Sequence, residues 1–293
     1  MTNVQALIDA ISNGALYGLA ALGIGLVFGV MRLANFAHGE LITIAAYSLV
    51  LTWHLGPWVA LPLALLASVV LALLLEFAVF RRMRRANPAT LLIASFGLSF
   101  LLQRVYEIAF GNNVRTAPVA PALARSVEIA GMRVQMLSLV TILAAAILLL
   151  ALHQFLNRSS LGLQVQAASA DFATARLLGV RANKVIALTF GISGALAAVV
   201  AFVLTVQTGA VAPTFGVNVT VLALIGAVIG GIDKLGTALV GGFLVGFASS
   251  ALTTYLPSEA VNFRNAFVFA VVMVILILKP SGLLVRGPVL ERA

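Results

Sequence analysis

The sequence contains no cysteine, so structural disulfides, thiolate nucleophiles and cysteine-ligated metal sites are excluded. Its three histidines, His38, His54 and His153, lie in separate segments and give no basis for predicting a metal site. The motifs G-x-x-x-x-G-K-[ST], H-E-x-x-H and G-x-S-x-G are all missing. We therefore expect neither ATP binding through a phosphate loop nor zinc or serine hydrolase chemistry, and we predict no catalytic residue.

Charge is also scarce. Only 9% of the residues are charged, against about 25% in an average soluble domain, while 62% are hydrophobic. Several apolar runs exceed the roughly 18–20 residues that cross a bilayer as a helix, and a β-barrel would instead show alternating segments of about 10 residues. The composition predicts an all-α polytopic integral membrane protein in which residues 1–293 form a single transmembrane domain.

The apolar runs predict about eight transmembrane helices. They cover residues 8–31, 42–55, 58–80, 88–110, 134–155, 185–206, 235–256 and 264–278. A further segment, 217–232, is short and is predicted either to span the membrane as a ninth helix or to re-enter it. Nine crossings would place the N-terminus outside, and eight would place it inside.

A net charge of +9 could indicate nucleic-acid binding, but the positions of the basic residues along the chain favour a role in membrane topology. Basic residues cluster in 81–85, in 158–184 and in 279–292. The positive-inside rule places these three clusters in the cytoplasm and the loop 111–133 outside. We therefore predict contact with membrane lipid and no nucleic-acid partner.

Polar residues interrupt the apolar sequence at two glycine-containing breaks, 32–40 and 230–237. The first break is either a short cytoplasmic turn or a partly embedded break in a helix that lines a cavity. Polar groups at membrane depth are costly unless they line water or protein, and short broken segments mark the pathway in many transporters. The candidate substrate-path residues are Asn35, His38, Glu40, Asp233 and Thr237. The alternative is that each is a satisfied polar group at a helix break.

The longest polar interruption is the segment 157–184. Its apolar residues recur at steps of three and four, which predicts that they share one face of a helix: Leu161, Val165, Ala168, Phe172, Ala175 and Leu178. A short amphipathic helix in a basic loop is a docking surface for lipid headgroups or for a soluble partner. A lipid-binding helix would carry more Lys and Arg and bulkier apolar residues, so we favour a partner.

Five stretches together resemble the permease subunits of branched-chain amino acid ABC importers, the hydrophobic amino acid uptake group. They are NFAHGELITIAAY; Arg81 and Arg84 followed by LLIASFGLSFLLQ; the spacing of Gly162, Ala167, Asp171, Ala175 and Gly179; VIALTFGISGALAAVVA; and the spacing of Gly230, Gly231, Asp233, Ala238, Gly241 and Gly242. They keep the family's order along the chain. Three residues depart from the family's pattern: Gln166 stands where Arg is usual, Lys234 where Ser or Asn is usual, and Thr237 where Gly is common.

The resemblance implies an importer subunit in the bacterial inner (plasma) membrane. It implies a second permease subunit, identical or paralogous, two cytoplasmic ABC ATPase subunits, and a periplasmic or extracellular substrate-binding protein. ATP and Mg would bind the ATPase subunits, and no cofactor would bind this chain. The segment 157–184, here named the coupling segment, would dock on the ATPase through Gly162, Gln166, Ala167, Asp171, Ala175, Leu178 and Gly179.

The substrate that the resemblance implies is a branched-chain or other small amino acid, moved by ATP hydrolysis on the partner subunits. The alternative is a stand-alone secondary transporter or channel for a small polar solute such as urea or an amide. Few acidic residues lie within the predicted spans, whereas ion-coupled carriers usually place an acid near the bilayer midplane.

Overall fold

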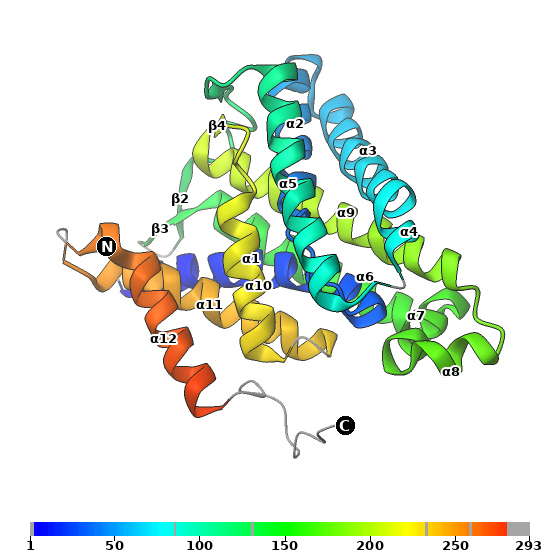
Figure 1. Cartoon of the computed structure of the whole chain (residues 1–293). Helices are drawn as coiled ribbons and strands as arrows, with labels where there is room; N and C mark the ends of the chain where they lie inside the picture. The colour runs from blue at the N-terminus through cyan, green and yellow to red at the C-terminus, as the bar shows by residue number, and fades with distance from the viewer. Residues whose placement is uncertain (1–2, 85, 130–131, 232–233, 258–259, 280–293) are drawn as a thin grey trace.

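The computed structural model describes residues 3–84, 86–129, 132–231, 234–257 and 260–279, and most of them are helical (Figure 1). The helices are α1 (Asn3–Met31), α2 (His38–Thr52), α3 (Pro57–Leu75), α4 (Arg81–Met83), α5 (Pro88–Phe110), α6 (Met136–Arg158), α7 (Ser160–Ala170), α8 (Phe172–Leu177), α9 (Ala182–Thr208), α10 (Val217–Gly230), α11 (Leu235–Tyr255) and α12 (Arg264–Leu278). The strands are β1 (Arg115–Thr116), β2 (Ser126–Ile129), β3 (Met132–Gln135) and β4 (Ala210–Val211). A π-helical turn, Glu76–Phe80, joins α3 to α4.

Each predicted span coincides with a helix, which confirms the prediction of a polytopic helical membrane protein. Within the described residues, six helices are long and apolar enough to cross a membrane: Val4–Met31, Pro57–Met83, Pro88–Phe110, Met136–Arg158, Ala182–Thr208 and Leu235–Tyr255. Helices α2, α10 and α12 have 15, 14 and 15 residues. At about 1.5 Å per residue they are shorter than the roughly 30 Å hydrocarbon core. The number of eight or nine crossings stays a prediction.

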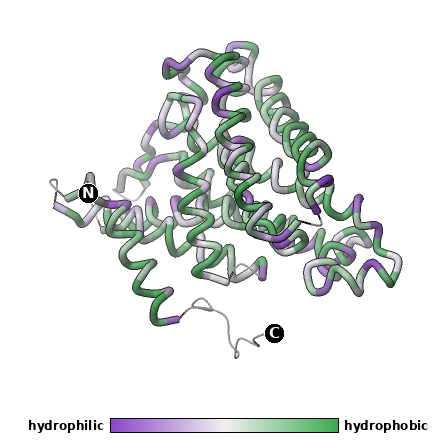
Figure 2. The backbone as a smooth tube through the Cα atoms, viewed as in Figure 1, coloured by the Kyte–Doolittle hydropathy of each residue, from purple (hydrophilic) through white to green (hydrophobic). Residues whose placement is uncertain are grey.

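The all-α expectation misses two small two-stranded sheets in the loops between helices. Strands β2 and β3 form an antiparallel hairpin, with Val127 opposite Val134. Strand β1 pairs with β4, with Arg115 opposite Val211, so the loop after α5 is joined to the chain that leaves α9. Figure 1 shows these strands on the opposite side of the molecule from α7 and α8. Hydrophilic residues gather at such loops, while the helices are mainly hydrophobic (Figure 2).

Helix α1 lies at the centre of the packing, and glycine allows its closest contacts. Gly242 of α11 faces α1 so closely that an added Cβ would overlap Ala21 Cβ and lie 2.7 Å from Tyr17 O. On the α1 side, an added Cβ at Gly14 would lie 2.9 Å from the ring of Phe243. Small residues allow helix backbones to approach closely where lipid provides no hydrophobic drive for association. Gly14 of α1 and Gly242 of α11 therefore serve the packing of these two helices.

The break after α1 is embedded in the protein. Arg32 has φ 53°, which turns the chain back, and α2 begins at His38. An added Cβ at Gly23 would lie 2.8 Å from His38 Cε1, so the start of α2 lies beside the interior of α1 rather than beyond its end. This geometry agrees with the partly embedded break and not with a short exposed turn.

Replacing Gly242 by alanine should destabilise the fold, because the new methyl group meets the backbone of α1. Overpacking of this kind costs about 1–3 kcal/mol. The matched control is Gly97→Ala on α5, where an added Cβ meets no atom of the described chain within 4 Å. Thermal unfolding of the two purified variants measures the difference. Equal melting temperatures would contradict the close α1–α11 contact.

Candidate functional site

The coupling segment consists of two short helices, which corrects the expectation of one helical face. Ser159 caps α7 by accepting a hydrogen bond from Gly162 N at 2.8 Å. Asp171 has an extended backbone, with φ −150° and ψ 101°, and it separates α7 from α8. Its Oδ1 accepts from Ala173 N and Thr174 N at 3.0 and 3.1 Å, which makes Asp171 the N-cap of α8. The chain changes direction at this cap. The spacing of three and four between apolar residues therefore does not define one continuous helical face across Asp171.

The buried side of the segment fixes it to the membrane helices. Val165, Ala168 and Ala175 are buried, as the pattern predicted, whereas Leu161 and Leu178 at its two ends are exposed. Gly162 lies against the end of α6, where an added Cβ would overlap Phe155 O. Of the predicted coupling residues, Gly162 and Ala175 thus face the protein and could act on a partner only by positioning their neighbours.

The opposite side of the segment is open. Ala167, Asp171, Leu178 and Gly179 are exposed, and Gln166 is half-buried with its Nε2 donating to Asn157 Oδ1 at 2.9 Å. Their docking on an ATPase, which the resemblance implied, stays a prediction.

The end of α8 presents two exposed leucines. Leu177 and Leu178 are 87% and 81% exposed. Behind them Gly179, at φ 89°, ends the helix: its N donates to Arg176 O, and Val180 N donates to Ala175 O, both at 3.1 Å. This is the Schellman pattern of a defined helix end. Sequence reasoning included Leu178 but missed Leu177, because a leucine next to an apolar stripe gives no sign of its exposure.

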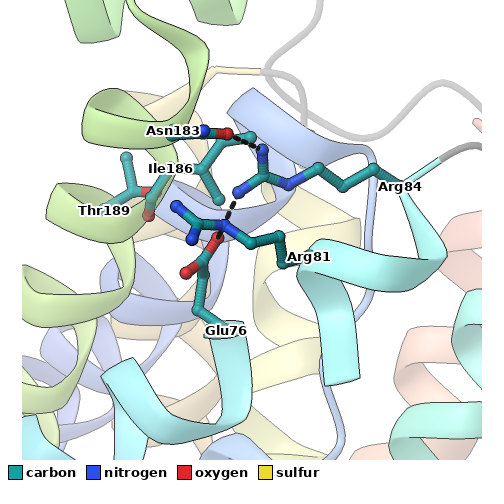
Figure 3. A network of polar contacts seen from close by, with 6 residues as sticks. All are labelled: Glu76, Arg81, Arg84, Asn183, Ile186 and Thr189. Carbon is teal, nitrogen blue, oxygen red and sulfur yellow. Dashed lines mark hydrogen bonds and ion pairs between the residues drawn. The ribbon is translucent and has the colours of Figure 1, made fainter. Parts of the chain in front are cut away.

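A cluster of polar contacts holds the start of α9, where the coupling segment ends (Figure 3). We name Glu76, Arg81, Arg84 and Asn183 the anchor cluster. Arg84 forms an ion pair with Glu76 and a hydrogen bond to Asn183 Oδ1, and Arg81 Nε lies 3.7 Å from Glu76 Oε1. Glu76 is 2% exposed, so its charge is compensated almost entirely by these two arginines. Nothing in the sequence indicates the link from Arg84 to Asn183.

A basic groove of about 990 Å³ lies between the anchor cluster and the coupling segment. Its lining includes Arg81, Arg82, Arg84, Phe172, Arg176, Arg181 and Lys184. Such a concentration of one sign of charge attracts acidic groups of a partner. The first two predicted cytoplasmic clusters thus meet in one surface, while the third lies largely outside the described residues.

The candidate path residues of the first break are buried and hydrogen-bonded. Asn35 Oδ1 accepts from Ala37 N at 3.0 Å, and His38 Nδ1 lies 3.1 Å from Ser193 Oγ on α9. Glu40 Oε1 accepts from Ser99 Oγ at 2.7 Å and from Gln103 Nε2 at 3.0 Å, both on α5. These contacts join α2 to its neighbours, while His38 Nε2 and Glu40 Oε2 are buried without a hydrogen-bond partner among the described residues. The assignment of the three residues to the path stays a prediction.

The second break packs near the same part of α1 as the first. Thr237 Oγ1 donates within its own turn, to Gly231 O at 2.6 Å. Ala238, the next residue, lies against Gly25, two positions from the Gly23 that faces His38. Asp233 lies outside the described residues, so its assignment to the path stays a prediction.

The chain matches a known protein family over nearly its whole length. The family described as "Branched-chain amino acid transport system / permease component" matches residues 6–278. The chain belongs to this family. It is accordingly a permease subunit by descent and a multi-pass protein of the inner (plasma) membrane.

Individual relatives are distant in sequence but similar in length. The high-affinity branched-chain amino acid transport system permease proteins BraD of Pseudomonas aeruginosa and LivH of Escherichia coli K12 are each 28% identical to this chain. The matches cover 98% of this chain and 97% and 96% of those proteins. LivM of Salmonella typhimurium, named for the same kind of system, is 26% identical over 94% of this chain and 69% of its own length. No solved structure matches the chain significantly.

Removing the carboxylate of the anchor cluster should be far more damaging than removing a half-buried carboxylate that pairs with an exposed arginine. Glu76→Ala leaves Arg84 without its buried partner, and breaking a buried pair costs about 3–5 kcal/mol. Glu107→Ala is the matched control: it removes the partner of Arg104, which is 77% exposed, and such pairs contribute about 0–1 kcal/mol. Thermal unfolding of the two variants measures this contrast, and a loss in Glu107→Ala as large as in Glu76→Ala would contradict the role of the anchor cluster.

Proposed function

We propose that the chain is the membrane subunit of a binding-protein-dependent ABC importer for branched-chain or other small amino acids. Family membership and the names of BraD and LivH support the system and the substrate class. Because the sequence has no phosphate-loop motif, ATP hydrolysis would occur on separate cytoplasmic subunits, which would also hold the ATP and Mg.

The observation that carries this proposal is the exposed end of α8. In a membrane protein, exposed leucines along the spans are expected because they face lipid. Leu177 and Leu178 instead lie in a polar segment, next to Arg176 and ahead of Arg181 and Lys184. Large apolar side chains kept exposed among charges mark a surface that another protein covers. An apolar cleft with an acidic rim on the ATPase would complement both the leucines and the basic groove.

The attachment of the coupling segment supports a mechanical role. Helix α7 contacts α1, with Ser169 Cβ 3.4 Å from the position of a Cβ added at Gly29, and it also contacts α6 and α9. The anchor cluster joins the start of α9 to the end of α3. Closure of the ATPases on nucleotide would push this segment as one body and shift α1, α6 and α9 together. That shift would alternate access to the pathway between the two sides.

The partner set follows from the same proposal. A second permease subunit, either a second copy or a paralogue, would complete the pathway, and the similarity of this chain to both LivH and LivM of Salmonella typhimurium supports a paralogue as one of the two choices. A periplasmic or extracellular binding protein would supply the amino acid on the side of the β-strands. The candidate path residues Asn35, His38, Glu40, Asp233 and Thr237 would then act mainly by maintaining the helix breaks near the pathway.

Reconstitution separates this proposal from a stand-alone carrier or channel. Liposomes that contain the chain alone should take up no leucine under a proton or sodium gradient. Liposomes that contain both permeases and both ATPases should take it up when ATP is enclosed and the binding protein is outside. Uptake by the chain alone would contradict the proposal.

Replacing the exposed leucines tests the docking surface directly. The double variant Leu177→Ala, Leu178→Ala should reduce ATP-driven uptake by at least about tenfold, the factor given by about 1.4 kcal/mol of lost docking energy. The control is Ile108→Ala on α5, which is also 87% exposed but lies on a membrane helix. Co-purification of the ATPase and leucine uptake are measured together. Normal ATPase binding and uptake in the double variant would refute the docking role.

A further inference from the structure

A polar cavity lies at the end of the molecule opposite the coupling segment. It has a volume of about 350 Å³, and its lining includes Asp9, Ser12, Ser138, Ser249, Thr253 and Arg264. These residues come from the first half of α1, the start of α6, the second half of α11 and the start of α12. The loop 111–133, which leads into α6, is predicted outside by the positive-inside rule. Because Ser138 near the start of α6 donates to Asp9 of α1, this end of the molecule is assigned to the outer side. The volume is at the lower end of the roughly 300–1,000 Å³ of small-molecule sites.

Two opposite charges line this cavity without neutralising each other. Within the part of the chain that the structure describes, neither Asp9 nor Arg264 forms an ion pair. Each is instead held by a hydroxyl group: Ser138 Oγ donates to Asp9 Oδ1 at 2.9 Å, and Arg264 Nη1 donates to Thr253 Oγ1 at 3.0 Å. The negative Asp9 attracts a cationic group and the positive Arg264 attracts an anionic group. A ligand that carries both charges would therefore be attracted at both ends.

A buried hydroxyl group in the same cavity lacks a partner. Ser12 is 2% exposed, and its Oγ has no hydrogen-bond partner among the described residues. Buried polar atoms in folded proteins are almost always hydrogen-bonded, and leaving one unpaired costs about 1–3 kcal/mol. Because Ser12 lines the cavity, a ligand there would supply the missing bond.

We propose that this cavity is an outward-facing site for the zwitterionic head group of an amino acid. Asp9 would face the ammonium group, Arg264 would bind the carboxylate through its planar fork, and Ser12 would add a hydrogen bond. The site rests on the proposed function, because it gives the carried solute a place in this chain. Its lining is polar, so it recognises the head group common to amino acids and leaves side-chain selection to the binding protein.

Transport stoichiometry tests the site in the complete transporter. Proteoliposomes with enclosed ATP and external binding protein receive radiolabelled leucine, and leucine uptake and ATP hydrolysis are measured in parallel. In Asp9→Asn and Arg264→Gln, leucine moved per ATP should fall by about tenfold or more, as expected for loss of a charge-assisted bond, while hydrolysis stimulated by the binding protein persists. Arg125→Gln, an exposed cation on the same side but outside the cavity lining, is the control and should behave as wild type.

Direct binding supplies the second measurement. Saturation-transfer NMR detects weak contact of leucine with the transporter in lipid nanodiscs, without the binding protein. The signal should weaken in Ser12→Ala, disappear in Arg264→Gln and survive in part in Arg264→Lys. Leucinol, which lacks the carboxylate, and isocaproate, which lacks the amine, should compete much less well than leucine.

The outcomes separate the two proposals. Absence of ATP-driven uptake by the wild-type transporter refutes the proposed function itself. If the wild type transports leucine, three results would overturn the site alone: unchanged leucine per ATP in both charge variants, a parallel loss of uptake and hydrolysis that shows a structural defect, or competition by leucinol and isocaproate equal to that of leucine.

Discussion

The hydrogen bonds that close the gap between α1 and α2 set the arrangement of the surrounding helices. A chain that leaves a helix inside an apolar environment exposes polar groups that only the protein itself can satisfy. Here Asn35 binds the backbone two residues ahead, and Ser95 of α5 accepts from Phe36 N at 3.3 Å. Ser99 and Gln103, further along α5, bind Glu40. The break therefore requires α5 at its side, and α5 in turn fixes the start of α2.

The same requirement brings α10 to α2. Thr43 Oγ1 accepts from Gly216 N at 3.0 Å, just before α10 begins, and a Cβ added at Gly39 would lie 2.9 Å from Gly216 O. Several residues that interrupt the apolar sequence thus hold short helices in place, although His38 Nε2 and Glu40 Oε2 have no hydrogen-bond partner among the described residues. The polar cavity beside Asp9 and Arg264 is separate from this framework, and its groups retain unused binding capacity. Buried polar residues can thus serve structure in one part of a transporter and leave recognition to another.

The sequence predicts much of this architecture because composition and helix length are local properties. Apolar runs locate the helices to within a few residues. Sequence-based prediction fails for contacts between residues that are far apart in the chain. Nothing in the sequence pairs Arg84 with Asn183 or places Asp9 and Arg264 in the lining of one cavity, because both depend on how helices pack. The division at Asp171 was missed for a different reason: a capping aspartate and an exposed aspartate on a continuous helix look alike in a sequence that satisfies the helical period on both sides.

Helix α9 is attached at both ends, and this limits how it can move. Its start is bound through Asn183 to Arg84, and the chain after its last turn enters β4, which pairs with β1. A rod attached at both ends cannot slide along its axis without breaking one attachment. Its remaining freedoms are rotation about its own axis and bending between the two supports. A push delivered beside its first turn would therefore reach the far side of the protein as torsion, with Ser193, which contacts His38, lying between the two fixed ends.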